Sequence, residues 1–145
     1  GAGTVGSGVY KLSQMMAGDF KNKTGAELEI KKVLVRSLKK EREGIKKEVL
    51  TDSWEEIVND PEIEIVIELM GGIEPARTYV IEALKAGKQG VTANKDLLAE
   101  HGQEIMHAAD ETGADLQFEA AVAGAIPIII GGGAGLSTAA GIYEL

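Results

Sequence analysis

The hydrophobic positions of this chain follow two spacings in turn, one typical of strands and one typical of helices. Strands are predicted where aliphatic and β-branched residues cluster, at residues 28–35, 63–69, 89–92 and 115–119. Helices are predicted where apolar residues recur every three or four positions or where capping signals bound a segment, at residues 5–16, 53–58, 75–87 and 96–112. This alternation predicts an α/β fold with a doubly wound, mostly parallel sheet.

Local signals define the expected ends of these elements. Ser53 and Glu56 have the spacing of a capping box and predict the start of a short helix. Gly71-Gly72 ends the strand of residues 63–69, and Pro75 suits the first turn of the helix that follows. Gly113 stops the helix of residues 96–112.

The C-terminal part of the chain is read differently. Pro127 interrupts the apolar run of residues 126–130, which argues against an ordinary central strand there. Residues 136–145 are predicted to form one more helix. A glycine-rich block, residues 131–135, separates the two segments.

Composition narrows the class of protein. The 145 residues are 44% hydrophobic, which is enough for one domain and one core. The chain has no cysteine, which excludes disulfide scaffolds, cysteine-ligated metals and thiol nucleophiles. No apolar run reaches the length of a membrane span. We expect a soluble, cytoplasmic protein that binds no membrane.

Charge is distributed unevenly. The net charge of −8 argues against nucleic acid as a partner. Residues 31–47 nevertheless hold eight basic and two acidic residues, a local charge of +6. Because the chain has only six aromatic residues, it offers no platform for stacking bases beside this segment. A small anionic ligand fits the basic segment better than a polymer.

The first six residues, GAGTVG, form a G-x-G-x-x-G pattern that opens a helix. In a Rossmann-type fold these glycines permit a tight turn and a close approach to a pyrophosphate, which the helix N-terminus then holds. The preceding strand that the motif requires is missing, because the chain begins at Gly1. A glycine-rich terminus without a ligand is the alternative interpretation of this hexapeptide alone.

Two further positions bear on a nucleotide. Arg36 follows the strand of residues 28–35, where an acidic residue would bind the ribose of NAD and an arginine pairs with the 2′-phosphate of NADP. NADP is therefore favoured over NAD, the alternative being a solvated basic loop. At the end of another strand, Thr92, Asn94 and Lys95 are suited to hold a nicotinamide ribose and a polar substrate. Helix capping by Asn94, with Lys95 merely exposed, is the alternative.

Together, GAGTVGSG, VLVR, NDPEIEIVIELMGGIEP, VTANKDLLAE and FEAAVAGAIPII resemble, in order and spacing, the nucleotide-binding part of homoserine dehydrogenase. The resemblance covers nearly all of residues 1–129. It implies an NAD(P)H-dependent reduction of L-aspartate 4-semialdehyde to L-homoserine, a small-molecule substrate pair, in threonine, methionine and isoleucine biosynthesis. It also implies a homodimer for the intact family member.

The resemblance assigns roles to residues position by position. Lys95 takes the place of a lysine near the nicotinamide and the substrate, where it polarises an oxygen or positions the semialdehyde. A sodium ion, found in some relatives, would be held by Glu119 and by main-chain groups of Val122, Gly124 and Ile126. The implied cofactor-binding residues are Gly1, Gly3, Thr4, Val5, Gly6, Arg36, Gly71, Thr92, Asn94, Lys95 and Gly135.

The chain also departs from the family. Residues 1–130 are expected to form the NAD(P)-binding domain, and residues 131–145 resemble a C-terminal segment that packs back on it. The substrate and dimerisation domain expected between them is missing, and so is the first strand at the centre of the sheet. The tail also resembles the glycine loop of FAD-binding proteins. A non-catalytic dinucleotide-binding module and a related dehydrogenase remain alternative functions.

Overall fold

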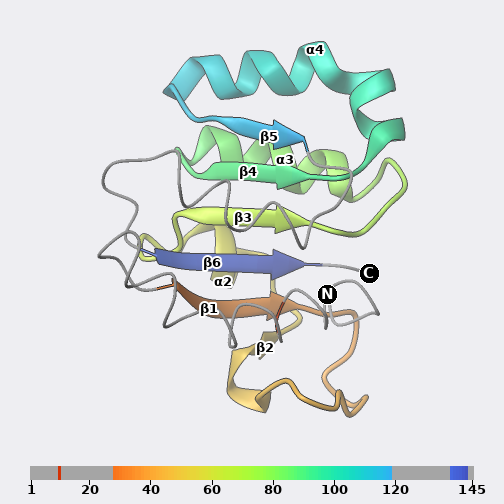
Figure 1. Ribbon diagram of the computed structural model, residues 1–145, viewed down its shortest axis with the longest axis vertical. Coiled ribbons are helices and arrows are strands. Elements are labelled where there is room, and N and C mark those ends of the chain that lie inside the picture. The colour runs from red at the N-terminus through yellow and green to blue at the C-terminus, as the bar shows by residue number, and fades with distance from the viewer. Residues whose placement is uncertain (1–9, 11–27, 119–137, 144–145) are drawn as a thin grey trace.

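The structure is a computed structural model that describes Tyr10, residues 28–118 and residues 138–143 (Figure 1). These residues contain a six-stranded sheet in the order β2-β1-β6-β3-β4-β5, and every neighbouring pair of strands is parallel. The predicted α/β fold with a mostly parallel sheet is therefore confirmed. The strands are β1 (Leu28–Leu34), β2 (Leu50–Thr51), β3 (Ile65–Glu68), β4 (Gln89–Thr92), β5 (Leu116–Phe118) and β6 (Thr138–Tyr143).

The C-terminal strand β6 occupies the centre of this sheet (Figure 1). The prediction of a helix over residues 136–145 is wrong, because residues 138–143 are extended and pair with both β1 and β3. Central strands of parallel sheets often lack the two-residue alternation of hydrophobic and polar residues that predicts a strand from sequence. The family resemblance implies a first strand at the centre of the sheet, and β6 occupies that position. The sheet order therefore follows the doubly wound pattern.

Helices connect the described strands near the positions predicted for them. They are α2 (Glu55–Val58), α3 (Ala76–Lys85) and α4 (Lys95–Thr112), with a 3-10 turn at Lys47–Val49. Pro75 is the N-cap of α3, and Gly113 ends α4 in the left-handed conformation. None of the helices in the described part of the chain is both long and apolar enough to span a membrane.

The capping box expected at Ser53 and Glu56 does not form. Trp54 is the N-cap of α2 and makes no side-chain cap. The Glu56 carboxylate instead accepts a hydrogen bond from the Thr51 hydroxyl, and the Ser53 hydroxyl donates to Glu55. The hydroxyl of Thr51 at the end of β2 thus competes successfully for the glutamate that the motif assigns to the helix start.

Two apolar clusters hold the helices against the sheet. One joins α3, α4 and the turn before β5 through Val80, Leu84, Leu97 and Ile105, among others. The other joins α2 to β1 and β3 and includes Trp54, whose ring stacks on Tyr79 of α3 with centroids 4.5 Å apart. Trp54 is therefore a packing residue, and these contacts fix α3 over the sheet.

Gly102 inside α4 and Gly113 at its C-cap provide a matched test of backbone conformation. A Cβ at Gly102 or Gly113 meets nothing within 4 Å, but only Gly113 has a left-handed φ, of +73°. Gly102→Ala is expected to stabilise the protein by about 0.5–1 kcal/mol, because glycine is unfavourable inside a helix. Gly113→Ala is expected to destabilise it by about 1–2 kcal/mol. Urea unfolding measures both, and changes of equal sign would contradict the argument.

Candidate functional site

The candidate site residues in the described part of the chain gather at one edge of the sheet. Because β1, β3 and β4 are parallel, their carboxyl ends lie at the same edge, as the arrowheads in Figure 1 show. Arg36 follows β1, Gly71 follows β3, and Lys95 follows β4. Doubly wound sheets bind their ligands at this edge.

The loop after β3 leaves space for a ligand to approach its backbone. Gly71 and Gly72 both have a φ of +72°, a conformation that favours glycine, and both are exposed. A Cβ built on either residue meets no atom within 4 Å. Two successive glycines with open space above them leave room for a ligand to lie against the main chain.

Glu68, the last residue of β3, is a buried carboxylate that the sequence analysis did not select. Only 1% of Glu68 is exposed. One carboxylate oxygen accepts hydrogen bonds from the backbone N–H groups of Met70 at 2.5 Å and Gly71 at 3.3 Å. The other oxygen accepts from the Thr92 hydroxyl at 2.6 Å. The carboxylate thus links the glycine loop to the end of β4.

Thr92 and Asn94 complete this hydrogen-bonded circuit. The Thr92 hydroxyl also accepts from the backbone N–H of Asn94 at 3.0 Å. The Asn94 side chain caps α4 by accepting from the N–H of Leu97 at 3.1 Å, and its amide nitrogen donates to the Gly72 carbonyl at 2.6 Å. The capping role weighed for Asn94 is confirmed, and the same side chain fixes the glycine loop.

Lys95 is exposed at the first position of α4. A cation at this end of a helix opposes the helix dipole, which stabilises negative charge at the N-terminus. The helix therefore gains nothing from the Lys95 ammonium. Lys95 follows Asn94, whose side chain bonds the Gly72 carbonyl, so it lies at the same edge of the sheet as the Gly71-Gly72 loop.

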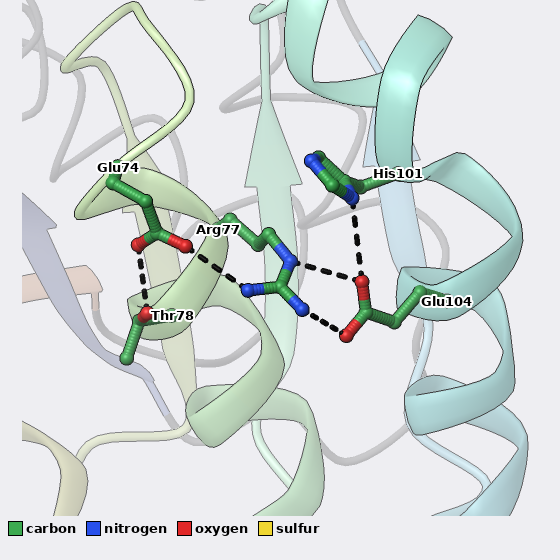
Figure 2. A network of polar contacts seen from close by, with 5 residues as sticks. All are labelled: Glu74, Arg77, Thr78, His101 and Glu104. Atoms are coloured by element: carbon green, nitrogen blue, oxygen red, sulfur yellow. Dashed lines mark hydrogen bonds and ion pairs between the residues drawn. The ribbon is translucent and has the colours of Figure 1, made fainter.

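A polar network joins α3 to α4 on the surface (Figure 2). The Arg77 guanidinium pairs with both oxygens of Glu104 and with Glu74, which also accepts from the Thr78 hydroxyl at 2.7 Å. Hydrogen bonding to Arg77 lowers the pKa of Glu104. His101 lies at a kink in α4, and its Nδ1 atom is 3.4 Å from the Oε2 atom of Glu104. The network ties together two helices whose first turns border the candidate site.

A cavity of about 650 Å³ lies in the loop after β1. Its lining contains four basic residues (Lys39, Lys40, Arg42 and Lys47) and two acidic ones, so its formal charge is +2. The Nε atom of Arg42 is buried and has no hydrogen-bond partner in the described part of the chain. Arg36 itself is exposed just before this loop. The arrangement suits an anionic ligand with an apolar part, since Leu38, Ile45 and Leu50 also line the cavity.

The remaining predicted site residues lie outside the described residues. They are the glycine-loop positions Gly1, Gly3, Thr4, Val5 and Gly6, the sodium-loop positions Glu119, Val122, Gly124 and Ile126, and Gly135. Among the described residues, no group of three or more histidine, aspartate or glutamate side chains is placed to hold a metal ion.

Comparison with known proteins identifies the domain. Residues 1–119 match the profile of a family described as "Homoserine dehydrogenase, NAD binding domain". Curated homoserine dehydrogenases of Bacillus subtilis (strain 168) and a Synechocystis species are 47% and 48% identical over 130 residues, which cover 89% of this chain and 30% of each relative. The chain therefore spans about 30% of the length of these relatives.

Solved structures agree with this assignment. A crystal structure of homoserine dehydrogenase from S. aureus superposes with a TM-score of 0.76 at 42% identity, covering 82% of this chain and 31% of that one. Homoserine dehydrogenase from Thiobacillus denitrificans superposes with a TM-score of 0.75 at 43% identity, covering 83% of this chain and 28% of that one.

Proposed function

The chain belongs to the homoserine dehydrogenase family, as its NAD-binding domain, and we propose that it is the cofactor-binding part of an enzyme that reduces L-aspartate 4-semialdehyde to L-homoserine. When bound, the nicotinamide dinucleotide supplies the hydride, while the protein supplies orientation and electrostatics. The observation that carries the proposal is the Gly71-Gly72 loop, which is open to a ligand and hydrogen-bonded to the start of α4. The reaction belongs to threonine, methionine and isoleucine biosynthesis.

The preferred cofactor is NADP(H). Arg36 stands after β1 where an NAD-binding sheet carries an acidic residue, and Ser37 follows it. The adjoining cavity adds four cations and two carboxylates, and the Nε atom of one of these cations, Arg42, has no hydrogen-bond partner among the described residues. These cations match the doubly charged 2′-phosphate of NADP, whereas the neutral 2′-hydroxyl of NAD gains nothing from them.

Each remaining residue has a role in this proposal. Gly1, Gly3, Thr4, Val5 and Gly6 contact the pyrophosphate. Gly71 and Thr92 border the nicotinamide-side ribose, and Asn94 bonds both Thr92 and Gly72, the neighbour of Gly71. Lys95 holds its ammonium toward the reacting carbonyl oxygen, where it positions or polarises the semialdehyde. Gly135 lies beside the cofactor.

Further proposals concern the parts outside the described residues and the intact protein. Residues 1–130 form most of the NAD(P)-binding domain, and residues 131–145 form a segment that returns to it and adds the central strand β6. A sodium ion binds through the Glu119 carboxylate and main-chain oxygens of Val122, Gly124 and Ile126, since hard cations prefer oxygen ligands. The intact enzyme is a cytoplasmic homodimer.

Calorimetric titration of the purified 145-residue chain with NADPH, NADH and FAD tests the proposal. We expect binding of NADPH, weaker binding of NADH and no binding of FAD. We also expect no oxidation of homoserine with NADP⁺, because the chain spans about 30% of its curated relatives. Heat-denatured chain serves as the control for non-specific uptake of ligand.

Three results would contradict the proposal in different ways. No binding of any dinucleotide would favour a module that keeps the fold without a cofactor. Preferential binding of FAD would support the flavoprotein interpretation of the tail. Robust homoserine oxidation by this chain would show that it already contains the substrate-binding groups.

A further inference from the structure

Glu68 is a buried ionisable group that is hydrogen-bonded to two parts of the candidate site, the glycine loop and Thr92. The other residues of β3, Ile65 to Ile67, are aliphatic and buried on both faces of the sheet. An apolar residue at position 68 would suit the same surroundings without desolvating a carboxylate. The carboxylate is compensated instead by three hydrogen bonds, two from the backbone of loop 70–71 and one from Thr92.

These hydrogen bonds join two parts of the candidate site, the glycine loop and Thr92. Glu68 pairs in register with Thr92 on the neighbouring strand β4, so its carboxylate lies between the ends of both strands. Two carboxylate oxygens provide enough lone pairs to accept from three donors at once, which no neutral side chain does without also presenting a donor. The glycine loop and Thr92 are thereby held at a set distance from each other.

We propose that Glu68 is a positioning residue for the nicotinamide half of the cofactor, acting through the backbone of Met70 and Gly71 and through Thr92. The inference rests on the proposed function and adds a residue to it. Glu68 does not touch the cofactor. It holds the Gly71-Gly72 loop against the end of β4, just before α4, so that the loop surface and Lys95 face the same ligand.

The test compares two ligands on one variant. NADPH reaches the whole site, whereas adenosine 2′,5′-bisphosphate carries the 2′-phosphate and lacks the nicotinamide half. Glu68→Gln keeps one oxygen that accepts from the loop N–H groups, but it removes the negative charge and replaces the oxygen that accepts from the Thr92 hydroxyl with an N–H₂ group. We expect the Kd for NADPH to rise about tenfold, as for the loss of one charge-assisted hydrogen bond, and the Kd for adenosine 2′,5′-bisphosphate to stay within about twofold.

Controls separate positioning from folding. Glu62→Gln removes a carboxylate of similar size that is 76% exposed before β3, at the opposite edge of the sheet, and is expected to change neither Kd. Thermal unfolding accompanies each titration. If Glu68→Gln does not fold, Glu68→Asp keeps the charge, shortens its reach by one methylene and is compared with the same two ligands.

The outcomes are distinguishable. Selective weakening of NADPH supports the positioning role. Equal weakening of both ligands, or of neither, in a chain that binds NADPH without the substitution overturns the role of Glu68 and leaves the proposed function standing. Failure of the unsubstituted chain to bind NADPH overturns the proposed function, and this inference with it.

Discussion

Replacing Arg36 by alanine is expected to raise the Kd for NADPH about 10- to 100-fold while leaving the Kd for NADH within about twofold. A hydrogen bond to a charged group contributes about 1.5–3 kcal/mol, which corresponds to that range of affinity. Arg36 is exposed after β1, so the substitution leaves no cavity in the core. Calorimetric titration of both cofactors at fixed ionic strength measures the two changes.

Lys85→Ala provides the matched control for Arg36→Ala, because it removes one exposed positive charge from the last turn of α3. We expect this control to weaken neither cofactor. The effect at Arg36 should also shrink as salt is added, since an exposed ion pair is screened. Equal losses for NADPH and NADH would refute a contact between Arg36 and the 2′-phosphate.

The elements with strong local signals were predictable from the sequence. The strand at Gln89–Thr92 and the helix that ends before Gly113 agree with the structure to within a residue. Both are bounded by residues whose backbone preferences are physical, such as a left-handed glycine. The capping box at Ser53 was predicted wrongly, because its glutamate, Glu56, accepts a hydrogen bond from the Thr51 hydroxyl instead.

Glu68 shows why the candidate site was only partly predictable. The alternation of residues 63–69 predicted a strand followed by a turn, and gave no reason to single out Glu68. In this parallel sheet β3 is buried on both faces, so the final glutamate faces protein and not solvent. A carboxylate that ends an aliphatic strand just before two glycines is the signal that would have identified it.

The C-terminal strand was missed because its place depends on distant partners. Residues 138–143 contain small residues and no clear alternation, and the residues they pair with in β1 and β3 lie about 110 and 75 positions earlier in the sequence. Residue propensities over ten positions do not reveal such distant partners, because the preference of a residue for a strand depends mainly on how it packs against neighbouring strands.

A chain that ends at residue 137 is therefore expected to lose its cooperative unfolding transition. β6 pairs with β1 at six positions and with β3 at four, and it alone connects β1 and β2 to the other strands of the described sheet. Each lost backbone hydrogen bond costs about 0.5–1.5 kcal/mol, and a domain is stable by only about 5–15 kcal/mol. Thermal unfolding followed by circular dichroism measures the loss.

Two further chains determine whether the effect belongs to the strand. A chain that ends at residue 143 retains β6 and should unfold at the same midpoint as the full chain. Gly141→Pro keeps the length but removes an N–H at a position that pairs with both Lys32 and Val66, where a central strand does not tolerate proline. We expect this single substitution to lower the free energy of unfolding by at least about 2 kcal/mol. An unchanged midpoint in the chain ending at residue 137 would mean that the sheet is stable without a strand between β1 and β3, and that β6 does not hold its two halves together.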